Sequence, residues 1–159
     1  HVIKTEIVPD NFHARYNVVE KTYEYYINIG EYNPLERNYV FQYNYHLNVE
    51  KMKDGIQYLL GEHDFRSFVT ENKEKENCVR TISTATVEKI NNDIIKFTFT
   101  GNGFLRYQIR NMVGILIRVG EEKESPEYVE KFLNKKDRST GGKTAPAEGL
   151  YLTNIKYKK

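Results

Sequence analysis

Cysteine, tryptophan and histidine are scarce in this sequence of 159 residues, which has one cysteine, no tryptophan and four histidines. The lone Cys78 cannot form an intrachain disulfide, which excludes a disulfide-stapled scaffold and favours a reducing compartment. Because no local motif activates this thiol, we expect a buried or incidental residue rather than a nucleophile. The histidines show no metal-ligand spacing with one another or with Cys78, so no zinc site is indicated.

A strong excess of charge and a long hydrophobic run are also lacking. The 24 basic and 22 acidic side chains leave a formal net charge of +2, so the net charge does not indicate nucleic-acid binding. Any basic surface must therefore come from segregation of charges in the folded chain. The longest apolar stretch is interrupted by arginines, which argues against a membrane span. Glycine-rich phosphate loops, nucleophile elbows and kinase signatures are absent as well.

The sequence does contain enough apolar and aromatic residues for one folded domain. Hydrophobic residues make up 39% of the chain and aromatic residues 13%, which argues against disorder. A chain of this length can bury a sizeable core. It begins on His1 rather than on methionine, and we expect it to be a piece of a longer protein.

The pattern of side chains predicts an α+β fold. β-branched and aromatic runs predict strands, at 22–29, 80–89, 94–100 and 149–157, the middle two joined by a turn at 91–93. Helical spacing predicts helices over 49–61 with Asn48 as cap, within 101–120, and from Pro126 to about residue 134. This order predicts an antiparallel sheet with helices packed on one face, in ferredoxin-like order with an added helix. In the last strand, Leu150, Leu152 and Ile155 are available for the core.

The stretch 101–120 is the most informative part of the chain. Its apolar residues recur at three- and four-residue spacing: Leu105, Ile109, Met112, Val113, Leu116 and Ile117. Arg106 and Arg110 lie one predicted helical turn apart on the flank of this face. Gly114 lies on the same line, where another backbone can approach closely, and Gly120 is predicted to cap the helix.

No acidic residue occurs between Ile95 and Gly120, whereas four basic residues do. Taken alone, this pattern leaves two interpretations open. The ordinary one is a core helix with solvated arginines at its edge. The other is a helix that pushes a guanidinium into an anion-binding cleft.

Several short motifs occur in a fixed order along the chain. They are 11–16 (Asn-Phe-His-Ala-Arg-Tyr), 21–25 (Lys-Thr-Tyr-Glu-Tyr), 60–68 (Leu-Gly-Glu-His-Asp-Phe-Arg-Ser-Phe), 79–82 (Val-Arg-Thr-Ile), 102–105 (Asn-Gly-Phe-Leu), 109–114 (Ile-Arg-Asn-Met-Val-Gly), 137–138 (Asp-Arg) and 144–152 (Thr-Ala-Pro-Ala-Glu-Gly-Leu-Tyr-Leu). Each motif is weak alone, but the ordered series resembles the C-terminal half of tRNA pseudouridine synthases of the TruA family. The resemblance spans nearly all 159 residues.

The resemblance implies an activity and a set of site residues. The family isomerises uridine to pseudouridine in the anticodon stem-loop of tRNA without a cofactor, and the resemblance also implies a cytoplasmic homodimer. Arg110 is the implied partner of the catalytic carboxylate, and Tyr23 is the implied active-site tyrosine that stacks on the base. Leu150 and Phe104 would line the substrate site. The implied phosphate contacts are Arg15, Arg106 and, more loosely, Lys21.

One departure from the family pattern is important. The family's nucleophilic aspartate lies in an Arg-Thr-Asp-Ala-Gly motif of its N-terminal half, and this sequence contains no such motif. Arg80 and Thr81 are followed by Ile82, and the aspartates of the chain lack that context: Asp10, Asp54, Asp64, Asp93 and Asp137. We therefore expect residues 1–159 to be a single C-terminal domain that carries half an active site and is inactive alone.

Two functions of other classes stay open beside this one. The chain could be a stand-alone RNA-binding module built on a ferredoxin-like sheet, but it lacks the basic-Gly-aromatic-Gly-aromatic signature of ribonucleoprotein domains. It could also be a dimerisation module in which the apolar helix is an interface.

Overall fold

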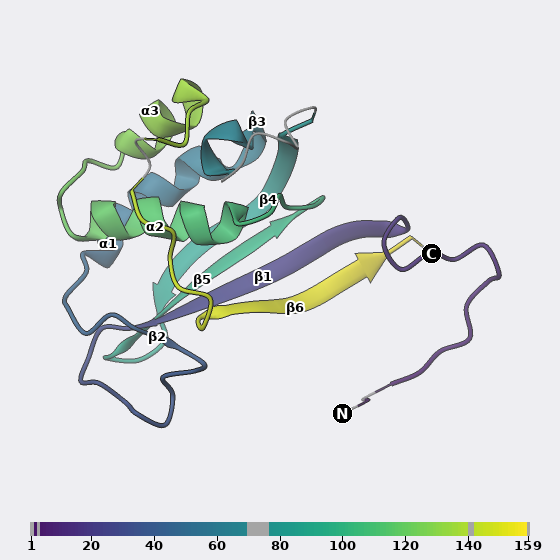
Figure 1. Ribbon diagram of the computed structural model, residues 1–159, viewed down its shortest axis with the longest axis horizontal. Helices are drawn as coiled ribbons and strands as arrows, with labels where there is room; N and C mark the ends of the chain where they lie inside the picture. The colour runs from purple at the N-terminus through teal and green to yellow at the C-terminus, as the bar shows by residue number, and fades with distance from the viewer. Residues whose placement is uncertain (1, 3, 70–76, 140–141, 159) are drawn as a thin grey trace.

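The computed structural model describes residues 2, 4–69, 77–139 and 142–158. Its sheet contains six strands, at Val18–Asn28 (β1), Phe41–Gln42 (β2), Gly61–Asp64 (β3), Val79–Lys89 (β4), Ile94–Gly101 (β5) and Leu150–Tyr157 (β6). The helices are Val49–Ile56 (α1), Gln108–Gly120 (α2) and Tyr128–Lys135 (α3), with 3-10 turns at Gln57–Leu59 (η1) and Phe65–Phe68 (η2). Figure 1 shows the three helices gathered on one side of the sheet.

The four long strands confirm the ferredoxin-like order. They lie side by side as β6-β1-β5-β4, and each neighbouring pair is antiparallel. The added strands extend this core, with β3 antiparallel to β4 and β2 parallel to the end of β1. The predicted antiparallel sheet with helices on one face is confirmed, and the short β2 adds a parallel contact where the chain loops back beside the end of β1. Two residue pairs make this parallel contact, Ile27 with Phe41 and Asn28 with Gln42.

Alternation along the strands places the core on one face of the sheet. Ile95, Phe97 and Phe99 of β5 are fully buried, whereas the residues between them are half-exposed. β-strand side chains alternate between faces, so the buried set faces the helices and the polar set faces away. The hairpin between β4 and β5 forms as predicted, because the Asn91 side chain accepts hydrogen bonds from the backbone N–H groups of Asp93 and Ile94.

The first helix is confirmed but is shorter than predicted. The Asn48 side chain accepts a hydrogen bond from Lys51 N at 3.2 Å, which satisfies a free donor of the first turn. α1 ends at Ile56, η1 continues to Leu59, and Leu60 is already extended. Gly61 then adopts φ +94° and begins β3, an edge strand too short to reveal itself by alternation. The sequence analysis missed both β3 and the following turn η2.

The central helix differs from its prediction at both ends. α2 begins at Gln108, so Leu105 and Arg106 precede the helix and Arg106 does not lie one helical turn from Arg110. Gly120 is not the cap but the last residue of α2, and the left-handed residue after the helix is Glu122. A side chain at Gly120 would collide with Met52, so this glycine serves close packing.

The close approach predicted at Gly114 is confirmed. A Cβ atom built there would overlap the carbonyl oxygen of Lys143, in the segment that leads into β6. The third helix also forms as predicted, ending one residue beyond the expected limit. Cys78 is buried with a free thiol. The charged composition of 71–77 predicts a solvated loop, and Gly141-Gly142 predicts a flexible one. Residues 71–76 and 141 lie outside the described residues.

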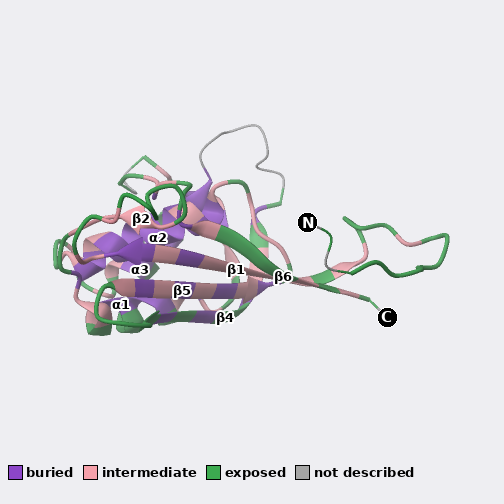
Figure 2. Cartoon of the chain, turned by 90° about the horizontal axis from the view of Figure 1, so that it is seen from below, coloured by how far each residue is buried: buried purple, intermediate pink, exposed green. Residues whose placement is uncertain are grey.

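The first half of β1 and most of β6 form a ribbon that extends beyond the helices (Figure 1). It is two-stranded only at Val18–Glu20, because β5 pairs with β1 from Lys21 onward. Buried residues concentrate in the helix-covered part, and the ribbon is largely half-exposed or exposed (Figure 2). Leu152 lies opposite Tyr23, on the face that carries the helices, but it does not join the core. The helices do not cover this part of the sheet, and the side chain is 46% exposed. Leu150 packs against the core, as predicted.

Candidate functional site

One pocket, with a volume of about 340 Å³, gathers most of the site residues inferred from the sequence. Its walls come from β1, from the turn before α2, from the first turn of α2 and from the start of β6. The lining residues are Tyr23, Phe104, Leu105, Arg106, Tyr107, Gln108, Ile109, Arg110 and Leu150. Five of the six residues predicted for the site therefore lie together, although they are up to 127 positions apart in the sequence (Tyr23 to Leu150).

The aromatic wall follows from the register of β1. Tyr23 and the fully buried Tyr25 alternate along the strand and share the face that carries the helices. The ring of Tyr23 packs edge-on against Phe104, with the ring centroids 5.4 Å apart. Partial burial raises the pKa of the Tyr23 hydroxyl above its usual 10.0, so this phenol keeps its proton near neutral pH. Tyr23 can thus donate a hydrogen bond and offer an aromatic face.

The stem of Arg110 is fixed by the segment 142–149, which leads into β6. Its Nε donates to Ala145 O at 2.6 Å, and Ala145 N donates to Arg110 O at 3.1 Å. Neither terminal NH₂ group of Arg110 donates to any described residue, and no described carboxylate lies within ion-pair range of it. Arg118 on the same helix differs, because it pairs with Glu124 at 2.6 Å. The charged fork of Arg110 is therefore available to an anion.

A buried hydrogen-bond network holds this segment against α2. Asn111 is 1% exposed; its Nδ2 donates to Phe68 O, and its Oδ1 accepts from Thr144 and Arg138. The Arg138 guanidinium also donates to Gly142 O and Thr144 Oγ1, and burial lowers its pKa. This network explains the position of the Asp137-Arg138 motif, whose role the sequence analysis left unassigned.

The turn before α2 contains a residue that the sequence analysis missed. Tyr107 lies between Arg106 and Arg110, with its ring centroid 5.0 Å from the Arg106 guanidinium carbon and 5.3 Å from that of Arg110. Arg106 itself is exposed, and its Nη2 donates to the Tyr107 hydroxyl at 3.3 Å. No sequence signal marks Tyr107, because its position depends on a left-handed backbone that a tyrosine seldom adopts.

The other two basic residues inferred from the sequence lie outside the pocket lining. Arg15 is exposed in the turn before β1, and its guanidinium lies over the ring of Tyr16 at 5.8 Å. Lys21 precedes Tyr23 by two residues on β1 and projects from the same face of the sheet.

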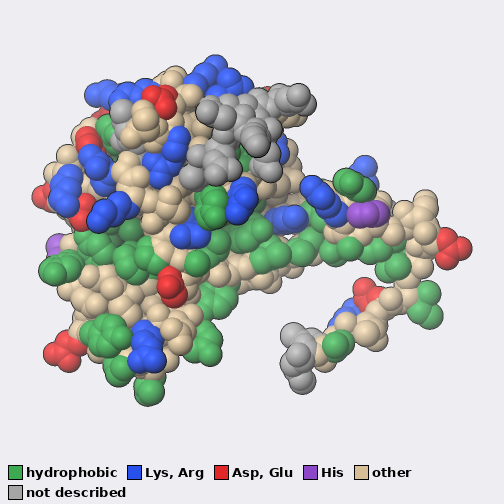
Figure 3. All heavy atoms as spheres, viewed as in Figure 1, with side chains coloured by type: hydrophobic (Ala, Val, Ile, Leu, Met, Phe, Trp, Pro, Cys, Tyr) green, Lys and Arg blue, Asp and Glu red, His purple; other side chains and the backbone are tan. Residues whose placement is uncertain are grey.

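The pocket is positive and lacks acidic residues. Its lining contains Arg106 and Arg110 but no Asp or Glu. Figure 3 shows Lys and Arg side chains outnumbering Asp and Glu over the helical part of this face, with further basic side chains along the extended ribbon. This face thus carries more positive than negative side chains, which suits a polyanionic partner.

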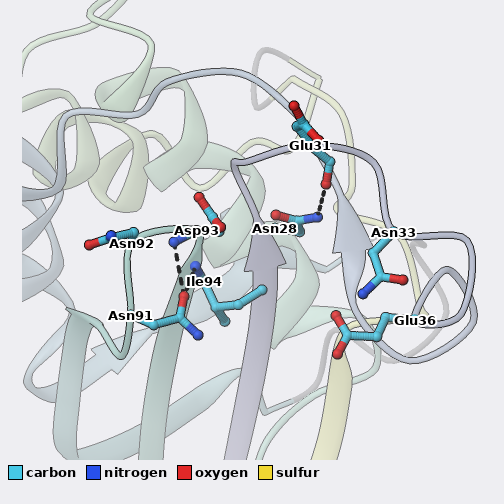
Figure 4. A pocket seen from close by; sticks show the side chains of 8 residues that line it. All are labelled: Asn28, Glu31, Asn33, Glu36, Asn91, Asn92, Asp93 and Ile94. Atoms are coloured by element: carbon cyan, nitrogen blue, oxygen red, sulfur yellow. Dashed lines mark hydrogen bonds between the residues drawn. The ribbon is translucent and has the colours of Figure 1, made fainter.

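A second pocket, at the far end of β1, has the opposite character (Figure 4). It is lined by Asn28, Glu31, Asn33, Glu36, Asn91, Asn92, Asp93 and Ile94. The Asn28 amide donates to Glu31 O at 2.7 Å, and the Asn91 side chain anchors the hairpin turn. Three carboxylates and no cation make this pocket unfavourable for a phosphate group.

Comparison with known proteins identifies the family of this chain. Residues 56–158 match the family model described as tRNA pseudouridine synthase. This chain belongs to the tRNA pseudouridine synthase family.

Bacterial relatives within the family match almost the whole chain. The proteins named tRNA pseudouridine synthase A from Limosilactobacillus reuteri and Lactococcus lactis are each 43% identical to it over 157 residues, which are 97% and 98% of this chain. The Streptococcus mutans protein of the same name is 44% identical over 158 residues. The chain spans only 61%, 62% and 64% of the lengths of these three relatives. In the part of the chain that the structure describes, no helix is long and apolar enough to cross a membrane.

Proposed function

We propose that this chain is the C-terminal domain of an enzyme that converts uridine to pseudouridine in the anticodon stem-loop of tRNA. The observation that carries the proposal is the state of Arg110. Its stem is fixed by Ala145 and its charged fork has no described partner, in a pocket shared with Tyr23 and Leu150. A guanidinium presented in this way can hold a carboxylate through two parallel hydrogen bonds.

The proposed reaction rearranges one nucleotide without a change in composition. The bond from uracil N1 to the ribose breaks, the base turns, and a new bond forms from C5 to the same ribose carbon. C5 loses a proton and N1 gains one, so no oxidant or reductant is needed. The uridine must first leave its stack to reach the pocket.

Each residue of the pocket has a proposed role in this sequence. Tyr23 stacks on the extruded base, a contact that contributes roughly 1–3 kcal/mol per base in comparable aromatic sites. Arg110 holds the attacking carboxylate ionised and correctly aimed. Phe104 and Leu150 close the apolar wall around the uracil, and Arg106 contacts a phosphate. Arg15 and Lys21 extend the phosphate contacts along the ribbon.

We infer that the attacking carboxylate is supplied from outside this chain. The pocket lining contains no acidic residue, and the sequence contains no Arg-Thr-Asp-Ala-Gly motif. Residues 1–159 thus form one domain of a two-domain enzyme and should be inactive alone. This inference agrees with the fraction of its relatives that the chain spans.

The resemblance also leads us to propose a homodimer working in the cytoplasm. The exposed ribbon supports a further contact, because Val19 and Leu152 expose 42% and 46% of their surface. Within the described residues, β6 pairs only with β1, and an unpaired apolar edge favours coverage by another segment or chain.

The full-length protein tests this proposal. It is incubated with an unmodified tRNA transcript, and pseudouridine is mapped by mass spectrometry after chemical derivatisation. We expect the modification at uridines of the anticodon stem-loop. Absence of pseudouridine, or its appearance only elsewhere in the tRNA, contradicts the proposal.

A further inference from the structure

Tyr107 has a backbone conformation that its side chain does not favour. Its φ is +63° and its ψ is −1°, and Gln108 N donates to Leu105 O at 3.1 Å across the turn. Tyr107 therefore occupies the third position of a four-residue turn, with the dihedral angles that a type II turn requires there. Glycine or asparagine is the usual residue at this position, and a bulky side chain is a genuine outlier.

This conformation places the ring where it touches both arginines of the pocket. The guanidinium carbons of Arg106 and Arg110 lie 5.0 and 5.3 Å from the ring centroid, within the range of cation–π attraction. Arg106 directly precedes Tyr107 in the chain, and Arg110 follows it on the first turn of α2. Tyr107 is half-buried and lines the pocket itself.

The ring completes the orientation of Arg110. Ala145 fixes Nε but leaves the guanidinium free to turn about the remaining bonds of the side chain. A ring on one side of the guanidinium removes part of that freedom, which matters because bidentate carboxylate binding depends on the plane of the fork. The exposed Arg106 has no such backbone anchor, and within the described residues its side chain hydrogen-bonds to the Tyr107 hydroxyl.

We propose that Tyr107 is a positioning residue that orients Arg110 toward the catalytic carboxylate and Arg106 toward the RNA backbone. This inference rests on the proposed function of the pocket. The positioning role explains why a tyrosine adopts the left-handed conformation where glycine would do so without strain. Backbone strain of this kind persists where the surrounding structure enforces it, and it is common at functional sites. The ring contacts both guanidinium groups, and the hydroxyl also accepts a hydrogen bond from Arg106.

The first test uses this chain and requires no activity. The ring current of Tyr107 should shift the Arg110 Nε–H resonance upfield in the NMR spectrum. Tyr107→Phe keeps the ring and should keep the shift, whereas Tyr107→Leu should abolish it. Tyr16→Leu is the matched control, because Tyr16 contacts Arg15 at 5.8 Å outside the pocket lining. A shift that survives in Tyr107→Leu overturns the proposed contact.

The second test measures turnover in the full-length protein. Tyr107→Leu should lower kcat about tenfold, in line with a cation–π contact between partly desolvated groups. Tyr107→Phe should leave kcat near wild type and raise KM about twofold to threefold, because only the Arg106 hydrogen bond is lost. Wild-type kcat in Tyr107→Leu overturns the positioning role.

Tyr107→Gly separates positioning from a purely structural role. Glycine adopts the left-handed conformation freely, so the thermal unfolding midpoint should stay unchanged or rise while kcat falls at least as far as in Tyr107→Leu. Loss of stability together with kcat would mean that the ring is only structural. If the wild-type enzyme makes no pseudouridine, the proposed function fails, and the NMR test on this chain still decides the role of Tyr107.

Discussion

At the scale of single residues, Arg110 combines a fixed stem with a free charged end. The Ala145 carbonyl takes one hydrogen bond from Nε, and the terminal NH₂ groups have no described acceptor. A solvated edge arginine would need no such anchor, since an exposed charge contributes only about 0–1 kcal/mol. The anchored stem therefore favours the anion-binding interpretation of this helix over the ordinary one.

Arg110→Lys should lower turnover of the full-length protein by orders of magnitude while its stability stays close to wild type. Lysine keeps the charge but loses both the planar fork and the Nε–H group that Ala145 accepts from. Steady-state pseudouridine formation and urea unfolding measure the two effects. Arg106→Lys is the matched control: a phosphate contact tolerates a point charge, so its kcat should change little. If kcat falls equally in both variants, Arg110 has no role beyond that of a positive charge.

Buried and half-buried tyrosines make the stability of this chain sensitive to alkaline pH. Burial, helped by a 2.6 Å hydrogen bond to Glu24, raises the pKa of Tyr26 to about 12, and burial also raises the pKa of Tyr23 and Tyr25. An unfolded tyrosine loses its proton near pH 10. Between these values the unfolded chain binds fewer protons than the folded chain, so stability is complete below pH 10 and falls as pH rises toward 12.

Tyr26→Phe should weaken that pH dependence. The free energy of unfolding, measured by urea denaturation at about pH 9 and about pH 11, should fall less in the variant than in wild type, because one proton-linked group has been removed. Identical falls in both proteins would show that Tyr26 does not take part in the alkaline transition.

At the scale of elements, the pocket depends on the contact between α2 and the segment 142–149. This segment accepts from the Arg110 and Arg138 side chains, and Pro146 O accepts from the buried Tyr25 hydroxyl at 2.6 Å. Gly114 allows the two backbones to touch, because any side chain there would overlap Lys143 O.

Gly114→Ala should therefore destabilise this chain by about 2 kcal/mol, the middle of the range for overpacking a close contact. In the full-length protein it should also lower kcat, since displacement of the segment moves the acceptor that fixes Arg110. Gly103→Ala is the matched control, because its added Cβ would come no closer than 3.8 Å to the flexible Arg80 side chain. Its free energy of unfolding should stay within about 0.5 kcal/mol of wild type. A stable Gly114→Ala variant would contradict the close approach.

Some features of these helices and strands could be predicted from the sequence, and others could not. The apolar face of α2, the hairpin at Asn91 and the close approach at Gly114 follow from spacing and residue type, and all three are confirmed. The start of α2 could not be predicted, because Leu105 continues the helical spacing while Tyr107 interrupts it with a left-handed backbone. Tyr107 was missed for the same reason, because a tyrosine in the sequence does not indicate a left-handed backbone.

At the scale of the whole molecule, the fold was easier to predict than the exposed surface. The order of strands and helices determined the β6-β1-β5-β4 arrangement, which brings Tyr23 and Leu150 together across neighbouring strands. The exposure of Leu152 could not be inferred, because its alternation matches a core strand and depends on where the helices stop covering the sheet. The pocket residues themselves were inferred from the family resemblance rather than from spacing.

At the same scale, the basic side chains of the pocket and ribbon predict weak RNA binding that depends strongly on salt. Each phosphate contact contributes a slope of about 0.9 in log affinity against log salt on a duplex and about 0.7 on a single strand. Fluorescence anisotropy of labelled tRNA with this chain, at several salt concentrations, measures the slope. Tight binding that salt does not weaken would mean that the basic pocket and ribbon are not the contact surface.

The central claim is that this chain holds half of a catalytic centre and receives its carboxylate from outside. The most direct test compares this chain with the full-length protein on the same unmodified anticodon stem-loop RNA, at a chain concentration high enough to saturate RNA binding. The account predicts that the full-length protein forms pseudouridine and that the chain binds the RNA but forms none. Pseudouridine produced by the purified chain alone would contradict it, because one of the chain's own carboxylates would then have to act as the nucleophile.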